Sequence, residues 1–240
     1  MTTINVNAIE SSTSTLTIGE SGNSVVAADS VNVNLVKDAS GATMWQSNGS
    51  GVLSNVNSKF GDSLVLLSTQ TASSSASISF TSGIDATYKK YIFKFITIHP
   101  GTSSMEFSFQ VSSDGGSSYG LNTTSTYFRA YHTQNDSVAT LSYTTGRDIA
   151  NGTGFIPMGF DLGMGNNDES ASGELHLFNP SSTTYVKNYY GRISMQQDTN
   201  AAFDGYVGGY INVTTAINAV QFKMSTGNID AGKIKMYGVK

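Results

Sequence analysis

The stretch MEFSFQV, residues 105–111, alternates strictly between apolar and polar side chains. Successive side chains of a β-strand point to opposite faces, so Met105, Phe107, Phe109 and Val111 should face one side of a strand. The same two-residue period recurs along the chain between turns rich in Gly, Ser and Asn. Together with two more continuously apolar runs at 64–67 and 91–96, the predicted strands cover residues 105–111, 126–131, 139–143, 173–178, 188–195, 205–213, 220–224 and 233–239.

This pattern predicts an all-β protein. About ten short strands with turns between them are typical of an antiparallel sandwich, and no segment holds a 3.6-residue period over three turns. We therefore expect an antiparallel β-sandwich, jelly-roll-like, with little helix. Residues 91–96 are too apolar for a strand wetted on one face and should form a central core strand. Asp114-Gly115 carries the signal of a tight hairpin.

The chain divides into two parts of different composition. Residues 1–60 are rich in Ser, Thr, Asn and Gly, with strand-like pieces at 14–18, 24–26 and 30–36. Such short strands bury little surface alone, so this extended β-rich arm should gain order by packing on sister subunits or a neighbouring protein. Residues 61–240 should form the sandwich. Residues 47–58 are the expected junction, with Trp45 before it as a core or junction anchor.

Composition excludes several classes of function. Charged residues make up 12% of the chain, against about 25% in an average soluble protein. The net charge of −4 comes with no Lys/Arg block, so no nucleic-acid partner is expected. The chain has no cysteine, which excludes disulfides and thiolate metal sites. The first residues lack the pattern of a signal peptide, and no apolar run approaches the ~20 residues of a membrane span.

Motifs of catalysis are missing. The histidines His99, His132 and His176 have neither the helical nor the strand spacing of a metal site and are expected to be structural or surface residues. No strand–helix context would hold a Gly-x-Ser-x-Gly nucleophile elbow, and no phosphate-binding loop occurs. We therefore expect no cofactor and no enzymatic activity.

The carboxylate side chains leave two alternative roles open, glycan cleavage and calcium binding. Glycan-cleaving enzymes need two carboxyl groups in one cleft. The acids considered for such a pair are Glu106, Glu174, Asp161, Asp168, Glu169, Asp198 and Asp204. Glu106 and Glu174 fall on the outward phase of their strands, where we expect them to face solvent. The loop at residues 163–169 concentrates oxygen ligands that suit Ca²⁺ but lacks the spacing of a recognised calcium loop.

Aromatic side chains are the remaining binding signal. Tyrosines at strand edges stack on sugar rings, but they also pack cores and subunit interfaces. The residues that could contact a glycan or a sister subunit are Trp45, Tyr127, Arg129, Tyr131, Tyr189, Tyr190, Tyr206 and Tyr210.

Several segments carry a resemblance to a known group of proteins. STQTASSSASISF (68–80), YKKYIFKF (88–95), FNPSS (178–182) and GNIDAGKIKMYGV (227–239) resemble the C-terminal β domain of marine bacteriophage virion structural proteins. LTIGESG (16–22) is similar to a short β element of phage tail-fibre shafts.

The resemblance implies a virion protein, commonly a homotrimer, and no catalytic residue. The corresponding expectation is a tail fibre, appendage or head fibre that is assembled in the host cytoplasm. Residues 1–60 would anchor it to other virion proteins, and the sandwich would be displayed toward a host surface polysaccharide. A capsid decoration (cement) protein and a glycan-degrading depolymerase are the alternatives.

Overall fold

The computed structural model describes residues 35–38, 40–47, 50, 53–54, 63–162, 169–197 and 199–240. The chain divides into two compact units, residues 1–60 and 61–240. All regular elements in the described ranges are β-strands, which confirms the all-β prediction. No helix in these ranges is long and apolar enough to cross a membrane.

The first unit contains a small antiparallel sheet in the order β1-β2-β3. Its strands are β1 (Leu35–Lys37), β2 (Thr43–Ser47) and β3 (Leu53–Ser54). Trp45 lies in β2 opposite Val36 of β1 and is half-buried. The strand pieces predicted at 14–18 and 24–26, and most of 30–36, lie outside the described residues.

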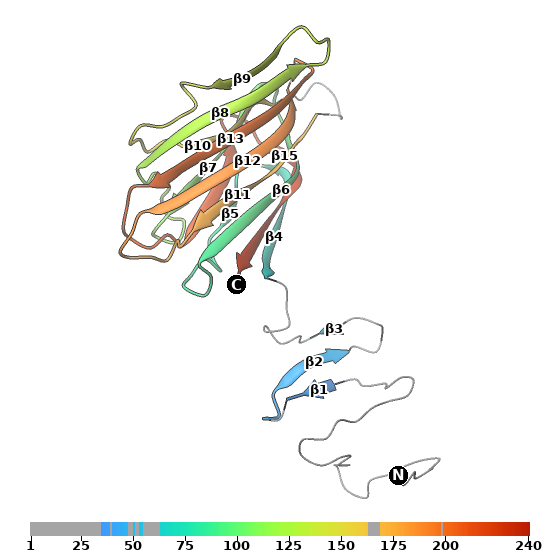
Figure 1. Cartoon of the computed structure of the whole chain (residues 1–240), viewed down its shortest axis with the longest axis vertical. Helices are drawn as coiled ribbons and strands as arrows, with labels where there is room; N and C mark the ends of the chain where they lie inside the picture. Colours follow the sequence, from blue (N-terminus) through green and yellow to red (C-terminus); the bar gives the residue numbers. More distant parts are fainter. Residues whose placement is uncertain are drawn as a thin grey trace, which may run out of the picture. The chain divides into compact units, whose positions relative to one another are not determined.

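The described part of the second unit holds twelve strands. They are β4 (Leu64–Ser75), β5 (Ile78–Phe80), β6 (Lys90–Pro100), β7 (Met105–Ser112), β8 (Thr123–Thr133), β9 (Ala139–Tyr143), β10 (Ile156–Leu162), β11 (Ala171–Phe178), β12 (Lys187–Gln197), β13 (Ala201–Ile211), β14 (Ala219–Met224) and β15 (Ile229–Val239). A wide sheet has the order β4-β15-β6-β11-β12-β13-β8-β9, and a narrow sheet has the order β5-β14-β7-β10 (Figure 1). Among the described residues, backbone pairing joins the two sheets only between Leu162 of β10 and Gln197 of β12.

The strand order is that of a jelly roll with two added hairpins. Without the pairs β8–β9 and β12–β13, eight strands remain, which can be counted from first to eighth along the chain. Side by side, the wide sheet then contains the first, eighth, third and sixth of these strands, and the narrow sheet contains the second, seventh, fourth and fifth. The two added pairs join the wide sheet beside β11 and double its width. The predicted antiparallel sandwich is thus confirmed, and the wide sheet has an outer face, directed away from the narrow sheet.

The core lies between the two sheets. Its centre is the ring of Phe222 on β14, which contacts five other phenylalanine rings with centroids 5.2 to 6.3 Å away. Those rings belong to Phe93 and Phe95 of the wide sheet and to Phe80, Phe107 and Phe109 of the narrow sheet. All six are at most 2% exposed. The alternation in residues 105–111 therefore describes a strand whose apolar face closes the sandwich.

One local prediction was wrong in part, and a second was wrong. The strand β6 is central, between β15 and β11, but its outer face is wet, because Lys94 is only half-buried and Ile96 is 41% exposed. Asp114-Gly115 forms a turn that does not join paired strands, since β7 pairs with β10 and β14. The Asp114 carboxylate there accepts hydrogen bonds from the hydroxyls of Ser112 and Ser118 and closes the loop that leads from the narrow to the wide sheet.

Two adjacent glycines of β13 have opposite surroundings. A Cβ at Gly209 would overlap the carbonyl oxygen of Thr124 and lie 2.7 Å from the hydroxyl of Tyr189. A Cβ at Gly208 would meet only the Thr126 hydroxyl, at 3.9 Å, among the described residues. The inward position must stay a glycine, whereas the outward position has room for a side chain.

We expect Gly209→Ala to lower the free energy of unfolding by about 1–3 kcal/mol, because an added methyl group must displace packed backbone. The matched variant Gly208→Ala should leave stability unchanged or raise it by up to ~1 kcal/mol, since alanine loses less chain entropy in a strand. Urea unfolding of the two variants beside the wild type measures both effects. Equal stabilities for the two variants would contradict the assigned faces.

Candidate functional site

Strand alternation sorts the predicted aromatic residues into two groups. Tyr127 on β8 and Tyr189 on β12 face the core and are at most 3% exposed. The Tyr127 hydroxyl donates a hydrogen bond to the carbonyl of Met158 at 2.8 Å, and the Tyr189 hydroxyl lies 2.9 Å from that of Thr123. Burial raises the pKa of Tyr189 to about 12. Neither ring is open to a ligand, so both act in packing.

Arg129 and Tyr131 also point inward, at the margin of the sandwich. The Arg129 guanidinium lies over the rings of Tyr131 and Phe160, at 5.3 and 4.9 Å from their centroids. Arg147, which follows β9, lies 4.8 Å from the same Phe160 ring. These half-buried cations cover the end of the core and leave the outer face to other residues.

Tyr190, Tyr206 and Tyr210 point outward from the wide sheet. Directly paired residues of antiparallel strands share a face, so Phe128, opposite Tyr206, belongs with them. The two rings stack with centroids 4.7 Å apart and planes 3° apart. Phe128 was missed in the sequence prediction, although its position next to an inward Tyr127 requires it to face outward.

A charged network fixes Tyr206 from its other side. The Arg192 guanidinium lies 5.1 Å from the Tyr206 ring centroid. Its Nε donates hydrogen bonds to both oxygens of Asp204, at 2.9 and 3.1 Å, and the Tyr206 hydroxyl donates to Asp204 at 3.1 Å. Hydrogen bonding to Asp204 raises the pKa of Arg192. The pair Arg192–Asp204 adds no net charge to the outer face, while it holds the tyrosine in place.

Tyr190 has a similar support on β11. His176 lies opposite Tyr190, and their rings stack with centroids 4.5 Å apart. The Nε2 atom of His176 lies 2.8 Å from the Glu174 carboxylate. His176 is 6% exposed, so this histidine is a structural residue, as expected.

Three adjoining hollows lie on the same outer face, and we call them together the trough. Their volumes are about 650, 390 and 300 Å³. The first two share His132 and Ala202, and the last two share Ser194. Small side chains form the floor, because Ala130, Ser172, Ser194 and Ala202 occupy outward positions on neighbouring strands.

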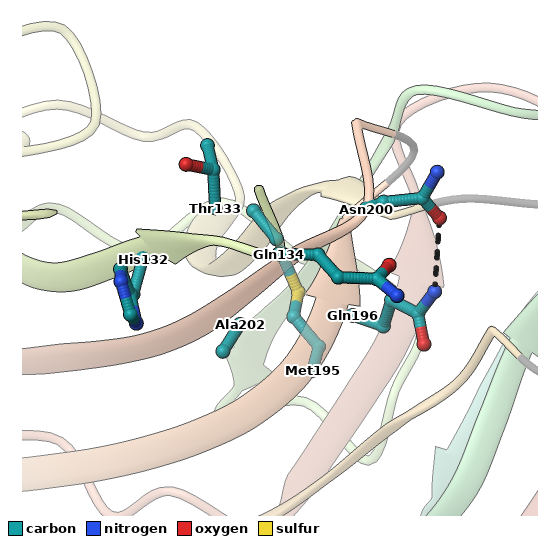
Figure 2. Close-up of a pocket in the computed structure, with 8 residues that line it drawn as sticks. His132, Thr133, Gln134, Met195, Gln196, Asn200 and Ala202 are labelled. Atoms are coloured by element: carbon teal, nitrogen blue, oxygen red, sulfur yellow. Dashed lines mark hydrogen bonds between the residues drawn. The ribbon is translucent and has the colours of Figure 1, made fainter. Parts of the chain in front are cut away.

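Neutral hydrogen-bonding groups line the largest hollow. Figure 2 shows the side chains of Gln134, Gln196 and Asn200 gathered on one side of it, with His132 on the other side of Ala202. The Gln196 amide donates a hydrogen bond to the Asn200 side chain at 3.3 Å. Amide groups that carry both donors and acceptors suit a ligand with hydroxyl groups.

The carboxylates do not form a metal site in the described ranges, where no group of three or more His, Asp or Glu side chains is placed to hold an ion. Residues 163–168 of the suggested calcium loop lie outside the described residues. The expectation that Glu106 faces solvent was wrong. Arg147 lies 3.3 Å from its carboxylate, which is only 20% exposed. Burial raises the pKa of Glu106, Arg147 lowers it, and Asp161 raises it further.

Comparison with protein-family models, with curated proteins and with solved structures found no match.

The raised pKa of Glu106 predicts a pH dependence of stability. The folded chain keeps the Glu106 proton to a higher pH than the unfolded chain, whose glutamates titrate near pH ~4.3. The stabilisation is full below that pH and is lost as the pH rises through the raised pKa. We expect the free energy of unfolding of the wild type, minus that of Glu106→Gln, to fall as the pH rises above about 4. Urea titrations of both proteins measure it, and a flat or rising difference would count against the buried carboxyl group.

Proposed function

We propose that this chain is a non-enzymatic surface protein of a phage virion, a tail fibre, appendage or head fibre, that contacts a neutral host glycan through the outer face of its wide sheet. The trough carries this proposal. It is long, open and lined by amides, hydroxyls and small side chains, with its main ion pair already neutralised within the face. A polysaccharide offers the matching hydroxyl groups along an extended chain.

The composition supports a glycan over other partners of the same face. Outside cells, a surface of hydroxyl and amide groups depends little on salt, whereas charged interfaces weaken with ionic strength. The stacked rings of Phe128 and Tyr206 lie two residues from Ala130 and Asp204, which line the trough, and add apolar surface beside polar groups. Apolar rings beside hydrogen-bonding groups are the common composition of small-molecule sites.

Assembly into a homotrimer, with residues 1–60 holding other virion proteins, is part of the proposal. Among the strands that the structure describes, the edge strand β9 pairs with β8 alone. It carries Leu141, which is 74% exposed, and Tyr143, which is 53% exposed, and Val138 before it is 44% exposed. Apolar residues on an unpaired edge are costly in a solitary chain, so contact with a sister subunit is the natural use of this edge.

Ala202→Trp should fill the floor of the trough without touching the core, since Ala202 is exposed. We expect this variant to lose at least about tenfold in affinity for host cells or host polysaccharide, equal to ~1.4 kcal/mol. Thr69→Val, a remote substitution on the outer face of β4, is the control and should bind as the wild type does. Undiminished binding by Ala202→Trp would refute the trough as the glycan contact.

Native mass measurement of protein purified from virions tests the assembly. We expect trimers for the wild type and a shift to monomers for Leu141→Lys, because a charge on the edge opposes close packing of strands. A wild-type chain that is strictly monomeric and absent from particles would contradict the proposal.

A depolymerase is the alternative of another class, and one observation favours it. Burial and the charge of Asp161 raise the pKa of Glu106, against the effect of Arg147, and a glutamic acid with a raised pKa suits general acid catalysis. Incubation with host surface polysaccharide separates the two. New reducing ends that disappear with Glu106→Gln would establish the enzyme and overturn the non-enzymatic function.

A further inference from the structure

The outer face has a gap at Gly208. Thr126, Gly208, Tyr190 and His176 lie directly opposite one another on β8, β13, β12 and β11. An added Cβ at Gly208 would meet only the Thr126 hydroxyl among the described residues. The row therefore contains a space that is bordered by Tyr190 on one side and Thr126 on the other.

The Tyr190 ring borders this gap in a fixed orientation. His176 covers the side toward β11, with ring planes 16° apart, and Phe178 lies 5.7 Å from the Tyr190 centroid. Tyr190 is nevertheless 48% exposed. Because its neighbour toward β13 has no side chain, the second ring face is left uncovered. A ring held in place before binding loses little conformational entropy when a ligand stacks on it.

Tyr206 and Tyr210 lie two residues before and after Gly208, about 7 Å away on each side along the strand. The faces of Tyr206 are taken by Phe128 and Arg192, so Tyr206 presents its edge to the gap. Tyr210 is 36% exposed. The Thr126 hydroxyl donates to the Gly208 carbonyl at 3.3 Å and keeps its lone pairs for an acceptor role.

We propose that the gap between Tyr190, Gly208 and Thr126 is a binding slot for one neutral pyranose ring. The apolar C–H face of the sugar stacks on the open face of Tyr190, and a sugar hydroxyl donates to Thr126. This assignment rests on the proposed glycan contact, because it names one sugar subsite of the same outer face. Gly208 and Asp204 are four residues apart on β13, about 13 Å, so an oligosaccharide can occupy the slot and the trough together.

Charge and ring geometry favour a neutral sugar over other ligands of aromatic sites. A cationic ligand needs several ring faces around it, and here Tyr206 offers only its edge. An anionic ligand needs an unpaired cation, but the Arg192 guanidinium donates three hydrogen bonds to Asp204, and the Lys90 ammonium lies over the Phe178 ring. Glu174, on the His176 side of the slot, also disfavours an anion.

Gly208→Val provides the sharpest test, because it fills the slot while a β-branched residue suits a strand. Tyr190→Ala removes the stacking face, and Thr69→Val is the control. Binding of the full chain is measured on an array of neutral hexose and N-acetylhexosamine oligosaccharides of up to six units, beside hexagalacturonate and phosphocholine. Isothermal titration with the best neutral probe then gives the affinities, and thermal unfolding verifies the fold of each variant.

We expect the wild type and Thr69→Val to bind a neutral oligosaccharide equally, and both slot variants to lose at least about tenfold. Full binding by Gly208→Val would overturn the slot. If Ala202→Trp lost binding in the same experiment, the trough and the proposed function would stand without the slot. A wild type that binds only hexagalacturonate or phosphocholine, or no probe at all, would also overturn the slot, and the location of the chain on virions would then decide the proposed function separately.

Discussion

The packing of Phe222 against rings from both sheets is the contact on which the rest of this structure depends. Its five neighbours come from β5, β6 and β7, so one side chain links strands that lie far apart in the chain. Aromatic pairs of this geometry contribute about 0.5–1.5 kcal/mol each beyond the burial of their area. The narrow sheet covers this cluster and completes the core of the sandwich. The opposite face of the wide sheet therefore does not have to be buried by other parts of the chain.

The two added hairpins supply the residues of the proposed binding site. The strands β12 and β13 carry Tyr190, Arg192, Asp204 and Tyr206, and β8 carries Phe128 in register with them. None of these outward residues is needed to close the core. Ladder pairing sets their spacing, and stacking and hydrogen bonds set their orientation, so the outer face is rigid without being part of the packed interior.

The sequence allowed the fold class to be predicted, because a period of two over many short segments has few other physical meanings. The site was only partly predictable. At Tyr127-Phe128 and Tyr189-Tyr190 both phases of the strand are aromatic, so alternation alone cannot tell core from surface. Glu106 follows the outward phase, but a loop that carries Arg147 covers it, and such a contact depends on tertiary structure. The neighbouring glycines at 208 and 209 cannot be distinguished in the sequence, because their surroundings differ only once the strands are paired.

The unequal surroundings of these two glycines have a consequence for how such a protein can diversify. Position 209 is constrained by the backbone beneath it, whereas position 208 can accept other side chains at little cost to folding. Under changing selection, a lineage could vary residue 208 by single nucleotide changes and alter what the surface recognises while keeping the scaffold intact. Within one dipeptide, position 208 can therefore change the outer surface while position 209 preserves the packing of the interior.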